Sequence, residues 1–388
     1  MNPFPPGLNL GNLFRLLSPW LIALTLCTPL AAVQHANPPS VPPLEAEPGA
    51  NLYWHEPGAF WEEGCDCTVQ TDSFGRAPRW YAAADLQALW RDNLRAHDFA
   101  SLGEGGPTVL STGSLDDEFK AGGRLLLGWT LSDWYRVEGI YLGAYDWRDS
   151  AAVRNSDLNS EGEVGNLFSP FSDFGASPIL GLDYNDFARI DFSSELDNFE
   201  LNLRRRIGLP AAPFEASFLV GVRYMQIQER FRYHTEANVP LPSGAVNDVL
   251  TSAGNDMIGV QVGLLTQWLV HPRAWIDCEV KGAAFSNAAD LHTDFENTDE
   301  DGIVTGYAGH DSKTVSVGLL DLSLMLNHQF TRVLTFRVGY SALFLTGLAL
   351  GSDNFSRDID LLTQGPVLLN DNGRVIYHGP TIGLVGAW

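Results

Sequence analysis

The chain has 388 residues, enough for one large barrel or two ordinary domains. Its formal net charge of −23 argues against a nucleic-acid partner, because phosphate binding requires a basic face. With 11 Trp, 11 Tyr, 21 Phe and 38 Gly beside only 24 Lys and Arg, the composition is that of a β-rich, aromatic-rich protein. The arrangement of the hydrophobic residues must therefore decide the class.

The N-terminus carries the only long apolar run of the sequence, residues 16–33, which follows Arg15 and ends among small residues. A charged start, an apolar run and a small-residue cleavage site are the order of a secretory signal. We place the cleavage after Ala32, with Ala36 as the alternative. Residues 1–32 are therefore predicted to be a signal peptide, and the protein to be exported.

Residues 33–77 are rich in Pro and show no sustained period, which predicts a periplasmic lead-in. Three cysteines remain after cleavage, and an odd count in an exported chain gives no disulfide framework. Cys65 and Cys67 are predicted to be a local thiol pair, and Cys278 to pack on the apolar face of a strand. No later apolar run is long enough for a membrane helix, so a membrane protein would have to be a barrel.

From residue 78 to residue 388, hydrophobic and polar residues alternate repeatedly. In one such segment Leu334, Phe336 and Val338 alternate with Thr335 and Arg337. A strand places successive side chains on opposite faces, so each segment has one apolar face and one polar face. The predicted strands are, in chain order, 79–91, 119–131, 135–147, 195–207, 214–233, 256–270, 273–285, two arms within 314–346, and 375–388.

The alternative is a soluble sandwich, but these strands are about twice the usual ~5–6 residues and match the ~9–11 residues that cross a bilayer. The connections also alternate in length. The short ones are 132–134, 208–213, 271–272 and 329–331, and the long ones are about 92–118, 148–194, 234–255, 286–311 and 347–374. Alternating short and long connections between an even number of strands are typical of outer-membrane barrels.

We therefore predict an all-β fold, a transmembrane antiparallel up-and-down β-barrel of about ten strands over residues 78–388. Twelve strands would result if the 148–194 connection contained a further pair around 187–192. Ten strands with short periplasmic turns place both termini in the periplasm and the protein in the cell outer membrane.

Aromatic residues at strand ends on the apolar face predict an interfacial girdle. They are Trp80, Trp90, Trp129, Tyr135, Trp147, Trp268 and Trp388. The last strand, which ends at Trp388, is similar to the terminal signal read by the barrel assembly machinery. Outer-membrane lipid and this machinery are the predicted partners, together with small solutes or ions.

Four segments, residues 194–206, 219–229, 258–263 and 338–344, resemble the planctomycete-type putative beta-barrel porin family, formerly a domain of unknown function. The likeness covers about 79–388. It implies an outer-membrane barrel and implies neither a substrate nor catalytic residues.

Charged residues recur on the polar, lumen-facing side of the predicted strands. They are Arg79, Asp85, Arg124, Arg136, Glu138, Glu200, Arg204, Arg223, Asp277, Glu279, Lys281, Asp321 and Arg337. They could form a charged constriction that selects ions, or an ion-paired plug, since buried charges must be paired or hydrated. Ten strands lie near the small end of barrels, whereas ~16–18 give wide channels, so we expect a narrow or gated lumen.

The predicted loop 286–311 is acidic, and its stretch 297–302 is similar to the start of a calcium loop. Such a loop needs a later carboxylate, where Ala308 and Gly309 stand instead, so a solvated acidic loop is predicted. The nine His residues show no pair at metal-ligand spacing. The sequence thus predicts no cofactor, no metal and no catalytic residue.

Three functions follow in order of preference. The first is a narrow porin-like pore or transport barrel. The second is a structural or surface-interaction barrel with a closed lumen and acidic external loops. The third, an outer-membrane hydrolase with catalytic residues at its loop tips, has no residue in its favour.

Overall fold

The computed structural model describes residues 79–93, 96–115, 119–158, 166–179, 181–207, 214–237, 245–299 and 301–388. All of them lie in one compact unit, His55–Trp388. The predicted signal peptide, the lead-in and the Cys65/Cys67 pair lie outside the described residues. No helix in the described ranges is long and apolar enough to span a membrane.

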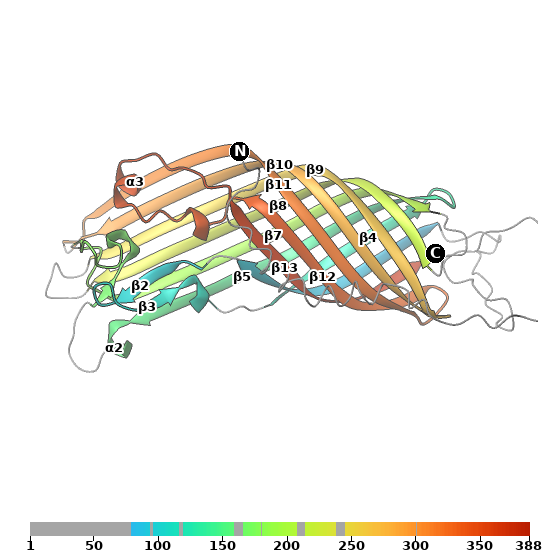
Figure 1. Ribbon diagram of the computed structural model, residues 1–388, viewed down its shortest axis with the longest axis horizontal. Coiled ribbons are helices and arrows are strands. Elements are labelled where there is room, and N and C mark those ends of the chain that lie inside the picture. Colours follow the sequence, from blue (N-terminus) through green and yellow to red (C-terminus); the bar gives the residue numbers. More distant parts are fainter. Residues whose placement is uncertain are drawn as a thin grey trace, which may run out of the picture. The chain divides into compact units, whose positions relative to one another are not determined.

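Ten antiparallel strands form a closed ring (Figure 1). Each pairs with the next strand of the ring, and β1 pairs with β13 to join the first and last strands. They are β1 (Trp80–Asn93), β4 (Lys120–Thr130), β5 (Tyr135–Arg154), β7 (Asn185–Ile207), β8 (Phe214–Ala237), β9 (Val246–His271), β10 (Ala274–Thr298), β11 (Val304–Gln329), β12 (Leu334–Leu348) and β13 (Gly373–Ala387). The predicted fold class, an antiparallel barrel of ten strands, is confirmed.

Shorter elements lie in the long connections. They are β2 (Asp98–Leu102), β3 (Thr108–Ser111), η1 (Thr112–Ser114), α2 (Asn155–Leu158), β6 (Leu167–Phe168), η2 (Pro170–Ser172), η3 (Ser352–Asn354) and α3 (Ile359–Thr363). The strands β6, β2 and β3 continue the sheet from β7. Residues 187–192 belong to β7 and pair with β5 and β8, so they add no further strand to the ring.

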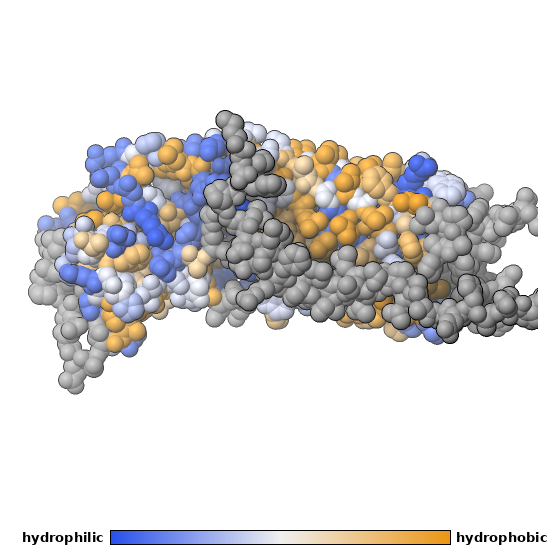
Figure 2. Space-filling model, in the orientation of Figure 1, coloured by the Kyte–Doolittle hydropathy of each residue, from blue (hydrophilic) through white to orange (hydrophobic). Residues whose placement is uncertain are grey.

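The outward face of the ring carries a hydrophobic band near the end of the barrel with the short turns. On β9 the exposed side chains run from Ile258 through Val260 and Leu264 to Val270. Thirteen residues of strand span about 40 Å, or about 28 Å along the membrane normal at a tilt of about 45°. That height matches the ~25 Å apolar band of membrane barrels. Figure 2 shows hydrophobic side chains gathered over the half of the barrel near the C-terminus.

The barrel wall is much taller on one side than on the other. Strands β7 to β11 have 23 to 26 residues, whereas β12, β13, β1 and β4 have 11 to 15. We call the first group, with the upper part of β5, the tall wall, and the second group the short wall. The tall wall continues toward the end with the long connections (Figure 1), past the half where the hydrophobic side chains gather (Figure 2).

The prediction of a long acidic loop at 286–311 is wrong. These residues form the ends of β10 and β11, which pair as far as Thr298 and Val304 and are joined by a tight turn. Within the hydrophobic band the outward side chains are apolar and the inward ones polar, and above the band this order is reversed. Leu291 and Phe295 are therefore buried inside. The side chains that point outward here are in water, and they include Asp290, His292 and Asp294. This run of polar residues led to the prediction of a solvated loop.

A bulge in β5 overturns the prediction that Trp147 belongs to the outer girdle. The register to β7 shifts between Leu142 and Tyr145, and Ala144 has a φ of 65°. One extra residue turns every later side chain to the opposite face. Trp147 therefore points into the lumen, where it is 5% exposed.

The short wall ends where β12 bends inward at Gly347, which has a φ of 92°. A Cβ at this position would lie 2.6 Å from the carbonyl oxygen of Ser316 on β11. The chain then continues inside the barrel as residues 348–351. The bend thus depends on a glycine for both its φ and its close contact.

We expect Gly347→Ala to lower the free energy of unfolding by about 1–3 kcal/mol, because alanine is strained at this φ and clashes with β11. Urea unfolding in detergent micelles measures the difference. Gly282→Ala is the control, because a Cβ there would meet nothing within 4 Å, and its change should stay within about 0.5 kcal/mol. Equal effects of the two substitutions would show that the bend at Gly347 is not required.

Candidate lumen site

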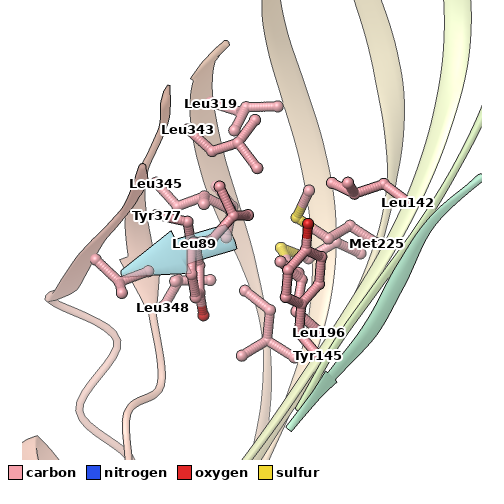
Figure 3. Packing of buried hydrophobic residues seen from close by; sticks show 14 of the residues in the cluster. Leu89, Leu142, Tyr145, Leu196, Met225, Leu319, Leu343, Leu345, Leu348 and Tyr377 are labelled. Carbon is pink, nitrogen blue, oxygen red and sulfur yellow. The ribbon is translucent and has the colours of Figure 1, made fainter. Parts of the chain in front are cut away.

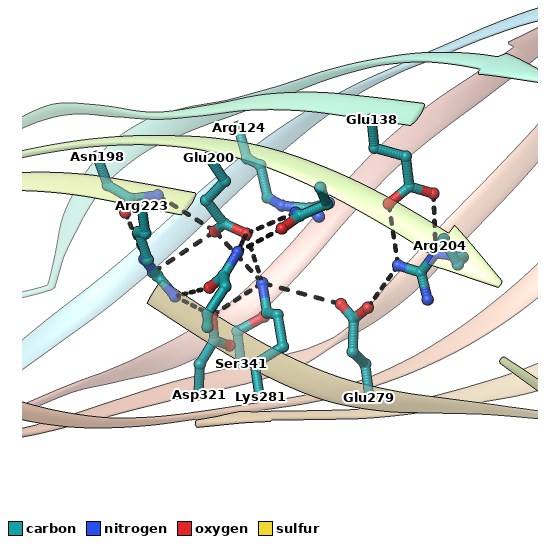
Figure 4. Close-up of polar contacts among 12 residues, drawn as sticks. Arg124, Glu138, Asn198, Glu200, Arg204, Arg223, Glu279, Lys281, Asp321 and Ser341 are labelled. Atoms are coloured by element: carbon teal, nitrogen blue, oxygen red, sulfur yellow. Dashed lines mark hydrogen bonds and ion pairs between the residues drawn. The ribbon is translucent and has the colours of Figure 1, made fainter. Parts of the chain in front are cut away.

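The lumen inside the hydrophobic band contains a network of buried ion pairs (Figure 4). At its centre the Lys281 ammonium lies 3.2 Å from Glu200 and 3.0 Å from Asp321. The Arg223 guanidinium, which is fully buried, lies 3.0 Å from Asp321 and 3.6 Å from Glu200. Two cations and two anions from β7, β8, β10 and β11 therefore neutralise one another.

A second group of the network lies nearer the short turns. Arg204 donates two hydrogen bonds of 3.0 Å to Glu138, one from Nε and one from a terminal nitrogen. It donates a third, of 2.7 Å, to Glu279, and Tyr81 donates to Glu138 at 2.7 Å. Two-pronged contacts of this kind are the strongest form of the arginine–carboxylate interaction.

A third group is centred on Asp85 of β1. Its carboxylate accepts two hydrogen bonds from Arg337 of β12 and one of 3.2 Å from Arg124 of β4. Together the three groups link nine of the ten ring strands, since only β13 and β9 lack a charged member and β9 joins through Gln261. Polar contacts in the lumen therefore involve nine of the ten ring strands.

Of the thirteen charged residues predicted to line the lumen, ten are members of these three groups. Asp277 faces the lumen beside them and accepts hydrogen bonds from the amides of Gln267 at 2.8 Å and Asn327 at 2.9 Å. Arg136 lies over the ring of Tyr81 at 5.9 Å. Arg79 is exposed just before β1 and contributes nothing to the network.

Neutral amides that the sequence analysis left out complete the network. Gln261 donates to Glu200 at 2.8 Å, and Asn202 donates to it at 3.1 Å. Asn198 accepts a 2.6 Å hydrogen bond from Arg223. These amides alternate in the sequence with the outward apolar residues. Their inward position was the sequence signal by which they could have been predicted as members of the network.

Above the network the lumen is filled by an apolar cluster, which we call the plug (Figure 3). Tyr145 and Trp147 stack at 5.2 Å, and Tyr377 lies 5.1 Å from Trp147. The buried members come from nine ring strands and from Leu350 beyond β12. They are Leu89, Leu142, Tyr145, Trp147, Leu196, Met225, Ile227, Met257, Phe285, Val317, Leu319, Leu343, Leu345, Leu348, Leu350, Val375 and Tyr377.

Residues 348–351 enter the plug from the long-connection end and are held there by polar side chains. Asn255 donates to the carbonyl oxygen of Ala349 at 2.7 Å and accepts from its N–H at 2.9 Å. The N–H of Gly351 donates to Glu229 at 3.0 Å, and Glu229 also forms a buried ion pair with Arg91. Asn255, Glu229 and Arg91 thus form a second polar layer above the plug, and the ion-pair network is the first polar layer below it.

Beyond this layer, the concave side of the tall wall is covered by the long connections. Phe99 and Phe355 pack on Phe231 and Tyr233 in a buried aromatic cluster. Burial raises the pKa of Tyr233 above its ordinary value, so that its hydroxyl stays neutral and donates to the carbonyl oxygen of Phe99 at 2.8 Å.

The described lumen leaves little free space. A cavity of about 210 Å³ lies at the short-turn end and is lined by Trp134, Arg136, Trp275 and Asp277 among others. A cavity of about 40 Å³ lies between the ion-pair network and the plug. Among the described residues, no three His, Cys, Asp or Glu side chains converge to hold a metal ion. The arrangement is that of a filled barrel with charges paired inside it.

The sequence profile of the family described as Putative beta barrel porin-7 (BBP7) matches residues 80–384. The comparison with curated proteins gives no match. The solved structures named below are similar in fold and distant in sequence. The outer membrane protease OmpT from Escherichia coli is 10% identical with a TM-score of 0.39, and the match covers 80% of this chain and 97% of that one.

Two other solved structures are similar at the same level. A major outer membrane protein from Thermus thermophilus is 10% identical with a TM-score of 0.27, over 79% of this chain and 99% of that one. A Pseudomonas aeruginosa FadL homologue is 11% identical with a TM-score of 0.28, over 80% and 90% of the respective chains.

Proposed function

We propose that the chain, which belongs to the putative beta barrel porin-7 family and is an outer-membrane β-barrel, is a structural or surface-interaction protein with a closed lumen rather than an open pore. The single observation behind this proposal is the plug, which occupies the lumen between two polar layers. In this proposal Arg79 and Trp388, at the short-turn end, face the periplasm. The hydrophobic band meets outer-membrane lipid, and no catalysis is assigned.

The charged residues of the lumen support the same proposal. A water-filled constriction would leave cations and anions hydrated and separated, whereas here they are within hydrogen-bond distance of one another and almost fully buried. Buried charges of this kind are tolerated only when paired. Their role would be to seal and hold the ring, in place of the ion selection considered from the sequence.

Planar-bilayer recording of the purified full chain tests the proposal. We expect no steady conductance above the bare membrane, and a general porin reconstituted in the same lipid shows that the assay detects pores. A shift of gel mobility on boiling verifies that the inserted protein is folded. A reproducible open-channel current from the folded chain would overturn the closed-barrel proposal.

A gated pore is the second candidate function, favoured by the cavity of about 210 Å³ at the short-turn end. A solute entering there would meet the ion-pair network and then the plug. The same recording separates the candidates, because a gated pore gives brief current steps under voltage or with solute and a closed barrel gives none.

A further inference from the structure

A groove hollows the hydrophobic band on the outside of the barrel. It has a volume of about 650 Å³ and crosses five neighbouring strands, β13, β1, β4, β5 and β7. The volume lies within the ~300–1,000 Å³ of ordinary ligand sites. The side chains that line it are almost all apolar, and the large ones are exposed on the outward face. We call it the outer groove.

Small residues form the floor of the outer groove. Ala82 of β1 pairs with Gly386 of β13. On its other side Ala82 pairs with Leu127 of β4, which in turn pairs with Gly139 of β5. Three of these four neighbours therefore bring a methyl group or no side chain to the outward face. A Cβ added at Gly139 would meet no atom within 4 Å, so the space above this position is open.

Larger apolar side chains form the walls, and they place the outer groove at a definite height in the band. Its lower end is at Trp388, just past the end of β13, at the short turns. Its upper end is at Phe199, eight residues before β7 ends at Ile207. Eight residues of a strand tilted by about 45° rise about 19 Å, which is most of the ~25 Å apolar band. At this upper end the hydroxyl of Tyr141 donates to Asp197 at 2.7 Å, so the groove ends at polar groups.

We propose that the outer groove binds one acyl chain of a phospholipid from the leaflet at the short-turn end. The groove is continuous with the hydrophobic band, which acyl chains surround in a transmembrane barrel. An unfilled groove loses van der Waals contacts, and a flexible apolar chain with its headgroup at the level of Trp388 restores them along the whole groove. The proposal rests on the transmembrane position of the band and not on the closed lumen.

Two other occupants are disfavoured. In hydrocarbon no hydrophobic gain draws two copies of the chain together, and the convex face of a second barrel does not fill a groove. The fourteen lining residues are also fewer than the ~20–30 on each side of a stable interface. The segment before Arg79 is the other candidate, but residues 62–78 include four acidic residues and one Arg. Its charges and its backbone would lack partners in hydrocarbon.

Native mass spectrometry of the full chain released from detergent micelles tests the proposal, with palmitoyl-oleoyl phosphatidylethanolamine as the probe. We expect one molecule to bind saturably. The dihexanoyl lipid with the same headgroup should bind at least about ten-fold more weakly, because its short chains leave most of the groove without contacts. Absence of saturable binding would overturn the proposal.

Two further outcomes of this measurement would also count against the acyl chain. Equal binding of the two lipids would show that the headgroup, and not the chain, is recognised. A dimer that forms in place of the lipid complex would show that the outer groove is an interface between copies. A shift of gel mobility on boiling verifies that each sample is folded.

Gly139→Leu and Gly282→Leu form the matched pair of variants. Gly282 lies on the outward face of β10, between Val262 and Leu320, and an added Cβ meets no atom within 4 Å at either glycine. Gly139→Leu fills the outer groove, so we expect it to weaken binding of the long-chain lipid at least about ten-fold. Gly282→Leu lies outside the groove and should change the binding less than about two-fold.

A second pair, Ala82→Leu in the outer groove and Ala284→Leu on the outward face of β10, repeats the comparison at alanines. The same difference between its two members is expected. Equal lipid binding within both pairs would place the lipid elsewhere on the band and overturn the proposal. The outcome does not depend on whether the lumen conducts.

Discussion

Replacing Arg223 by methionine is expected to lower the free energy of unfolding by about 3–5 kcal/mol, the usual cost of removing one partner from a buried ion pair. The guanidinium is fully buried between Asp321 and Glu200, and its Nε donates to Asn198 at 2.6 Å. Without it, two carboxylates share the single ammonium of Lys281. Urea unfolding in detergent micelles, followed by tryptophan fluorescence, measures the loss.

Arg230→Met is the matched control, because Arg230 lies on the same strand but is exposed on the outward face. Its change should stay within about 0.5 kcal/mol. The comparison also reports on the lumen itself. If water filled the barrel, the carboxylates around Arg223 would be hydrated and both variants would behave alike, so equal stabilities would contradict a sealed lumen.

Trp147→Ala is expected to lower the free energy of unfolding by about 3–5 kcal/mol, as for other large aromatic residues removed from a core. The indole stacks on Tyr145 and lies against the tilted ring of Tyr377 in the plug, and its N–H donates to the carbonyl oxygen of Leu89 at 3.2 Å. Its removal leaves a cavity and removes this hydrogen bond. The same unfolding assay measures the change.

Trp134→Ala serves as the reference for this substitution, because Trp134 is 45% exposed at a short turn and should cost less than about 1 kcal/mol. A small effect of Trp147→Ala would mean that the side chain lies on the lipid face, where the sequence pattern alone had placed it. The pair of variants therefore tests the bulge at Ala144 as well as the plug.

The ten ring strands could be predicted from the sequence because, in the membrane half of each strand, apolar residues recur at alternate positions and charged or other polar residues stand mostly between them. The upper halves of β7, β9, β10 and β11 could not. There the apolar side chains, such as Leu291 and Phe295, turn to the inside and the polar ones to water, which reverses the pattern of the membrane half. The point of reversal marks the membrane boundary, and only the structure shows that one strand continues through it.

The charged part of the lumen site was accessible from the sequence, since ten of the thirteen predicted residues lie in the ion-pair network. The plug was not, because its members follow or precede outward apolar residues, as Leu319 precedes Leu320 and Leu343 precedes Phe344. Such adjacent pairs place apolar side chains on both faces of one strand. Trp147 was wrongly predicted to lie in the outer girdle, because nothing in the sequence predicts the bulge at Ala144.

The pairing of β1 with β13 also sets a condition on how the protein is made. Trp80 and Trp388 exchange backbone hydrogen bonds of 3.1 and 2.9 Å, so β1 finds its second neighbour only after β13 has been synthesised. Contacts between such distant parts of a chain slow folding, because a long loop must close before they form. Until then the backbone N–H and C=O groups at the open edges of β1 and β12 have no partner strand. A chain that lacked β13 would therefore expose unpaired backbone groups to hydrocarbon.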